Sequence, residues 1–298
     1  MLIRRALPFL LLCAAAGAAQ GQPVIARPLT LPQGGLEVTL HGTYSNWSST
    51  AFGGGDSLDG ETLALGLDYG LSDSAQLGIA VALPINPGAS FGSVLASASF
   101  AAGDAAAVRV DLGYERVGFN GDTNGLDISH DDRFFAGLGA PLKFPLTPTL
   151  AFVSGHAGSV HFGHFTNIGQ NGLGLYLGST MFTETGSDFF VFSTADHDGG
   201  TYIGINLPAG LLLQPDPVFA LTLLAGYSAA ISIPSSGSTE ALHFIPVGLE
   251  AVVTPVSALD IGLRFSIDGY VAHSGSGSPG NLGYFDLRAL MFWLRLRA

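Results

Sequence analysis

The sequence predicts an all-β protein, a transmembrane antiparallel up-and-down β-barrel, on three observations. Only 11% of the 298 residues are charged and the mean hydropathy is +0.41, whereas soluble proteins carry about 25% charged residues. Prolines interrupt the long apolar stretches 205–225 and 241–259, which argues against spanning helices. Apolar residues instead alternate with small or polar ones over segments of about ten residues, the habit of barrel strands. A closed barrel satisfies every backbone hydrogen bond in lipid.

Residues 1–21 have the pattern of a secretory signal peptide. Two arginines precede an apolar stretch over 6–16, and small residues follow it. We expect this segment to be removed, which leaves 22–298 as the barrel. Cys13, the only cysteine, lies in the removed part, so we expect a mature protein without disulfides.

Each predicted strand presents an apolar face and a small or polar face. The segment 36–45, LEVTLHGTYS, sets Leu, Val and Tyr against Glu, Thr and His, and 62–70, 75–84 and 107–116 follow the same rule. The clearest case is 258–268, ALDIGLRFSID. Since successive side chains of a strand point to opposite faces, we expect the apolar face to contact lipid and the other to line the lumen.

Short connections between these strands alternate with long, polar, glycine-rich ones. The short ones are 71–74, 103–106, 145–148, 184–187, 214–217 and 254–257, and the long ones are 46–61, 85–92, 119–132, 156–172, 194–201, 232–240 and 270–283. Short periplasmic turns and longer external loops are typical of outer-membrane barrels. The count predicts 14 strands with both termini in the periplasm, and 12 remains the alternative because four of the strands are weak.

Aromatic residues near the ends of predicted strands suit the girdles found at the two membrane interfaces. They are Tyr44, Trp47, Tyr69, Tyr114, Tyr227, Tyr270 and Trp293.

The stretch 67–84, LDYGLSDSAQLGIAVALP, combines two such strands with a polar turn. It resembles a hairpin that recurs in porin-like outer-membrane transporters of Gram-negative bacteria, including those grouped with the MetA phenol-degradation proteins, and 249–265 is a weaker echo. The resemblance implies the barrel architecture and porin-like transport. Such barrels usually end in an aromatic residue, whereas this chain ends FWLRLRA, so we expect a bulge near 291–294 or a short tail.

Most inward positions are predicted to be small, which would leave a water-filled pore unless a loop folds into it. The charged pore-lining candidates are Glu37, Asp68, Arg109, Asp111, Glu115, Glu250, Asp260, Arg264, Asp268, Asp286 and Arg288. Two interpretations stand side by side. The charges either face one another across the channel and favour polar solutes, or they form salt bridges that stiffen the wall.

Two groups of Asp and His, at 130–132 and 196–198, do not have the spacing of a catalytic pair, because adjacent side chains of an extended chain diverge. We therefore expect no enzyme. His156, His161 and His164 are weak metal candidates, since imidazole binds Zn, Cu and Ni. Their spacing is not that of a known tight site, and we expect no cofactor.

The net charge of −12 excludes nucleic acid as a partner, because phosphates demand a basic surface. We expect the chain to be exported to the cell outer membrane. Its expected partners are outer-membrane lipid and the barrel-insertion machinery, with periplasmic or outer-membrane proteins as further ones. The predicted function is a porin-like channel for passive passage of small solutes. The alternative is a structural barrel that anchors an envelope-spanning complex, such as secretion or surface-motility machinery.

Overall fold

The structure is a computed structural model of the chain. It describes residues 23–47, 58–86, 93–117, 131–154, 167–168, 175–176, 188–194, 201–233, 239–274 and 287–298. The predicted signal peptide and the three histidines of the weak metal candidate lie outside these residues. Within the described part of the chain, no helix has the length and apolarity needed to cross a membrane.

The described elements are one short 3-10 turn and a series of strands. The turn is η1 (Val24–Ala26). The strands are β1 (Leu36–Trp47), β2 (Leu58–Ser72), β3 (Ala75–Asn86), β4 (Ser93–Ala101), β5 (Ala107–Val117), β6 (Asp131–Gly139), β7 (Leu142–Thr147), β8 (Leu150–Ser154), β9 (Asn167–Ile168), β10 (Leu175–Tyr176), β11 (Asp188–Thr194), β12 (Thr201–Asp216), β13 (Phe219–Ile233), β14 (Glu240–Val256), β15 (Leu259–Ser274) and β16 (Leu287–Arg297). β9 and β10 pair with each other, and all the other strands belong to one antiparallel sheet.

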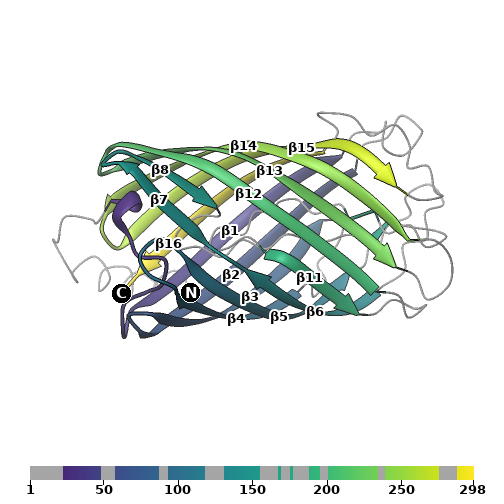
Figure 1. The fold of residues 1–298 in the computed structure, drawn as a ribbon, viewed down its shortest axis with the longest axis horizontal. Coiled ribbons are helices and arrows are strands. Elements are labelled where there is room, and N and C mark those ends of the chain that lie inside the picture. Colours follow the sequence, from purple (N-terminus) through teal and green to yellow (C-terminus); the bar gives the residue numbers. More distant parts are fainter. Residues whose placement is uncertain are drawn as a thin grey trace, which may run out of the picture.

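This sheet closes on itself into a barrel (Figure 1). Neighbours in sequence pair from β1 to β6 and from β12 to β16, β11 bridges β6 and β12, and β16 pairs with β1. Leu36 and Ala298 exchange two backbone hydrogen bonds of 2.8 Å where the last strand meets the first. The up-and-down barrel predicted from the alternation is confirmed, and the closed ring has twelve positions.

Twelve positions arise from fourteen strands because two positions are each filled by two strands. β6 and β7 follow one another across Ala140 and Pro141. β8 and β11 share the position beside β12, β8 toward the periplasmic turns and β11 toward the external loops. Five of the six predicted short turns join paired strands, and the sixth, 184–187, lies outside the described residues. The prediction of 14 strands therefore agrees with the number of strands in the sheet, and the alternative of 12 agrees with the number of positions in the closed ring.

The registers of β8 and β11 show that the chain between them is an insertion into a single strand position. From Val153 to Val191 the chain advances 38 residues, while their partners on β12, Gly210 and Gly204, are only six apart, which leaves 32 extra residues. The pairings on the other side give the same result. Ser154 pairs with Leu142 of β7 and Val191 pairs with Gly137 of β6, so the chain advances 37 residues between partners that are only five apart, which again leaves 32 extra residues.

We expect that deleting residues 155–186, which joins Ser154 to Ser187, leaves a barrel that folds. The deletion removes 32 residues and so preserves the register on both sides. Heat-modifiable migration of the refolded protein on SDS gels measures the result. Deleting only 155–185 is the matched control, because a slip of one residue turns every side chain of β11 to the opposite face. Equal folding of the two deletions would contradict the register argument.

The outer face of the barrel is apolar. Leu65, Ile79 and Leu112 have exposed fractions of 53%, 51% and 61%, whereas Ala64 and Ala80, one residue away, are buried. An exposed apolar band of this extent on a water-soluble protein would be an aggregation surface. Around a closed barrel it is the surface that contacts acyl chains.

Candidate functional site

The candidate site is the lumen, and its inner wall carries ion pairs between near neighbours. Arg264 of β15 lies opposite Glu250 of β14 in the register, and its guanidinium donates to the Glu250 carboxylate at 2.6 and 2.8 Å. Arg109 pairs with Asp111, two residues along β5 on the same face, at 2.7 Å. All four side chains are buried. This geometry favours the interpretation that the charges brace the wall over the one in which they oppose each other across an open channel.

The periplasmic mouth is occupied by residues 23–35, here called the N-terminal plug. Val24 and Ile25 of η1 belong to one apolar cluster with inward residues of β8, β12 and β16, among them Val153, Leu212 and Trp293. Because these side chains are buried, the lumen is filled at this level. The sequence allowed for closure by a loop, and the segment that closes the mouth is the start of the described chain.

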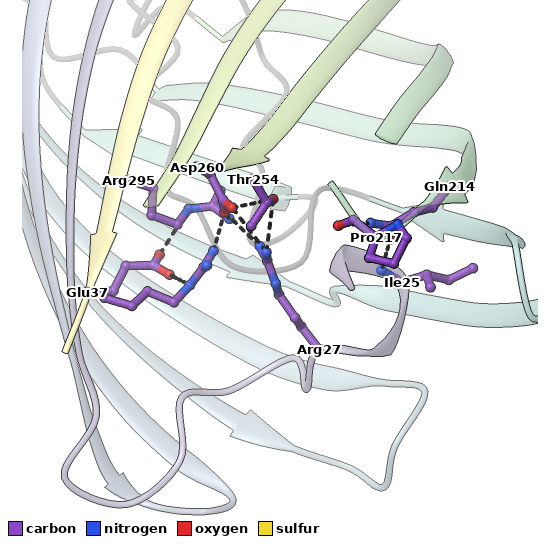
Figure 2. A network of polar contacts seen from close by, with 9 residues as sticks. Ile25, Arg27, Glu37, Gln214, Pro217, Thr254, Asp260 and Arg295 are labelled. Atoms are coloured by element: carbon purple, nitrogen blue, oxygen red, sulfur yellow. Dashed lines mark hydrogen bonds and ion pairs between the residues drawn. The ribbon is translucent and has the colours of Figure 1, made fainter. Parts of the chain in front are cut away.

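Polar groups hold the first half of the plug to the wall. The backbone N–H of Ile25 donates to the Gln214 amide oxygen at 2.9 Å, and the ammonium group of Lys143 donates to the Arg27 carbonyl. Figure 2 shows the plug reaching from Gln214 toward Asp260 inside the barrel.

Asp260 is the centre of the charged network in the mouth (Figure 2). Arg27 of the plug donates to its two carboxylate oxygens at 2.6 and 3.0 Å. Thr254, Arg297 and Arg295 also donate to Asp260, at 2.7, 2.5 and 3.3 Å. Burial lowers the pKa of the Arg27 guanidinium and the nearby Arg297 adds to this effect, whereas the bond to Asp260 acts in the opposite direction. The Asp260 carboxylate thus accepts hydrogen bonds from three guanidinium groups at once, those of Arg27, Arg295 and Arg297.

The second half of the plug lies against β2 and β3. The N–H of Leu31 donates to the Gln76 amide oxygen at 2.8 Å, and Gly34 and Gly35 form backbone bonds with Gly70 at 2.8 and 2.9 Å. A Cβ at Gly70 would overlap the Pro32 carbonyl. Gly34 has a φ of +79°, a conformation that side chains disfavour, so glycines permit the turn from plug into β1.

The pore-lining candidates fall into three groups. Seven have buried side chains: Glu37, Asp68, Arg109, Asp111, Glu250, Asp260 and Arg264. Glu115 and Asp268 lie in β5 and β15, but their side chains are not described, and Asp286 lies outside the described residues. Arg288 is exposed, one residue from the buried Ala289. Its placement in the lumen was wrong, because the inward residues of β16 are the odd-numbered ones.

The end of β16 supplies residues that sequence reasoning missed. Met291, Trp293 and Arg295 are buried, and the pairing of β16 with β1 and β15 continues to its end without a register shift. The expected bulge near 291–294 and the interfacial role of Trp293 were therefore wrong. Trp293 fits inside because it lies over Gly262, and the Arg295 guanidinium stacks 4.6 Å above its ring. Residues 289–294, ALMFWL, are all apolar and show no polar–apolar alternation, so the signal for the inward direction was the odd numbering that Met291 and Trp293 share with Arg295 and Arg297.

Arg27, Lys143 and Arg297 were also missed. Arg27 precedes the first strand and carries no alternation, and Lys143 lies in a strand read as weak. Arg297 belongs to the same odd-numbered face as Arg295, bonding Glu37 at 2.8 Å. Within the described part of the chain, no group of three or more His, Cys, Asp or Glu is placed to hold a metal ion.

Comparisons with known proteins agree with this fold. No protein-family model matches the sequence, and no curated protein matches it with significance. Among solved structures, an outer membrane channel from Pseudomonas putida F1 aligns over 95% of this chain and 100% of its own, with 11% identity and a TM-score of 0.53. The NanC porin and the KdgM porin in complex with disordered oligogalacturonate align over 87% of this chain and 98% of theirs, with 7% and 6% identity and TM-scores of 0.45 and 0.40. The closed strand ring, the apolar outer belt and the likeness to the Pseudomonas putida F1 channel show that the chain has the fold of an outer-membrane β-barrel.

Proposed function

We propose that the protein is a porin-like channel that allows small solutes to cross the outer membrane passively. The observation that carries the proposal is a ring closed on all sides, whose inward residues include small ones such as Ala64, Ala80 and Ala82. A barrel of this size lies between those of about eight strands, which side chains fill, and those of 16–18 strands, which leave an aqueous channel. The room inside this one is taken in part by a segment of the chain itself. A space that holds a peptide segment also holds a small solute once that segment leaves.

Passage would need no cofactor and no energy source. Selectivity would come from the width of the lumen. Outer-membrane lipid and the barrel-insertion machinery are the partners that this role requires.

Planar-bilayer recording of the refolded protein tests the proposal. We expect discrete single-channel steps, and swelling of protein-loaded liposomes in small neutral sugars but not in large oligosaccharides. The control is the same preparation of protein left unfolded. A folded barrel without steps or swelling, with and without the plug, would overturn the channel function.

The closed mouth favours one second candidate, a structural barrel that anchors an envelope-spanning complex. Such a barrel would pass no current in any form. It would instead retain periplasmic proteins through purification in mild detergent, and the same bilayer recordings separate the two functions.

A further inference from the structure

We propose that the N-terminal plug is a gate, held shut by the contact of Arg27 with Asp260 and able to leave the mouth as a unit. The inference rests on the proposed channel function and adds to it a defined closed state and the residue that locks it.

The plug touches the wall all round the mouth. Its hydrogen-bond partners come from β2, β3, β7, β12, β14 and β15. Val24, Ile25 and Arg27 are exposed by only 4%, 7% and 8%, so the segment lies inside the barrel and not across its rim. A chain segment with this burial and these partners obstructs the passage at the periplasmic end.

The plug is nevertheless separate from the wall. The sheet begins at Leu36, and no residue of 23–35 is part of a strand. Gly34 and Gly35 are the last two residues of the plug, next to the start of β1, and backbone rotation costs least at glycine. Residues 23–33 can therefore swing away without breaking any strand pairing of the ring.

The wall remains satisfied when the plug leaves. Asp260 keeps the guanidinium groups of Arg295 and Arg297, and Glu37 neutralises these two arginines at 3.4 and 2.8 Å. The ammonium group of Lys143 loses its hydrogen bond to the Arg27 carbonyl and is hydrated in the open lumen instead. Loss of a residue whose only role is to stabilise the barrel would leave its partner as an uncompensated buried charge. Departure of Arg27 leaves no such charge, because Asp260 keeps its other two guanidinium partners.

The lock is a charge-assisted, two-point bond, the strongest common kind of hydrogen bond in proteins. Arg27→Gln keeps most of the length of the side chain but removes the charge and the second donor. We expect the open probability in bilayer recordings to rise by about tenfold or more, since 1.4 kcal/mol corresponds to tenfold. Deletion of residues 23–33 should give the same open state without closures.

Arg288→Gln is the matched control. It removes the same charge from an exposed arginine on the outer face, and we expect recordings like those of the unsubstituted protein.

A reversible cross-link tests the motion itself. Because the only cysteine is Cys13, in the predicted signal peptide, Ile25→Cys with Gln214→Cys places a single thiol pair between plug and wall in an Arg27→Gln background. A short bis-methanethiosulfonate reagent should close the channel, and a reductant should reopen it, while each single cysteine shows neither change.

The outcomes separate the two proposals. If all forms conduct equally, the gate is overturned and the channel stands. If no form conducts, including the deletion of 23–33 and the reduced cysteine pair, both are overturned. Conductance that rises with Arg27→Gln and falls on cross-linking supports both.

Discussion

Replacement of Arg264 by methionine is expected to destabilise the barrel by about 3–5 kcal/mol, the usual effect of removing one partner of a buried ion pair. Arg264 is 1% and Glu250 0% exposed, and their groups meet at 2.6 Å. Without the guanidinium, the Glu250 carboxylate would remain charged in the wall of the lumen, with neither water nor its counter-ion.

Equilibrium unfolding in urea with lipid vesicles, followed by circular dichroism, measures this loss. The control is the double variant Arg264→Met with Glu250→Leu, which removes both charges and is expected to recover most of the stability, since apolar replacement of a whole buried pair is often neutral. If the single and the double variants were equally unstable, packing of the arginine stem rather than charge pairing would be its main contribution.

Gly262→Ala is the substitution with the second largest expected effect, about 1–3 kcal/mol of destabilisation, as for overpacking in a filled core. A Cβ at this position would lie within the indole of Trp293, which is 1% exposed. The ring cannot move inward freely, because Arg295 stacks on it. The methyl group therefore displaces the tryptophan or bends β15.

Gly66→Ala is the matched control, because its Cβ would meet Ala80 at an ordinary 3.7 Å, and we expect little change in stability. Unfolding of both variants is compared by circular dichroism in the same vesicles. The cause is tested by adding Trp293→Leu, which should remove most of the penalty at Gly262. A penalty that persists in the double variant would point to the backbone of β15 rather than to the indole.

The sequence predicted the barrel because alternation is written into each strand separately. In 258–268 the residues Leu259, Ile261 and Leu263 oppose Asp260, Gly262 and Arg264, and the structure keeps this division. The same rule gave no signal at Trp293, because residues 289–294 are all apolar, and the preference of aromatic residues for the interface led to the wrong prediction there. The prediction for Arg288 was wrong because a charge was assigned to the lumen, whereas the inward residues of β16 are the odd-numbered ones.

The number of strand positions was not decided by the pattern. An insertion of 32 residues within one position has the length of a pair of strands with a turn, and only the pairing of β8 and β11 with the same neighbours distinguishes the two. Local periodicity carries no record of which strand lies next to which.

By itself, the sequence determined the faces of the strands, the membrane surface and the barrel architecture, because these follow from solvation of each side chain one residue at a time. Only the tertiary structure decided the closure at twelve positions, the occupied mouth and the pairing of its charges. Arg27 lies 233 residues from Asp260, and Glu37 lies 260 from Arg297. Ring closure brings these groups together, and a contact between parts of the chain so far apart leaves no mark on the residues around either one.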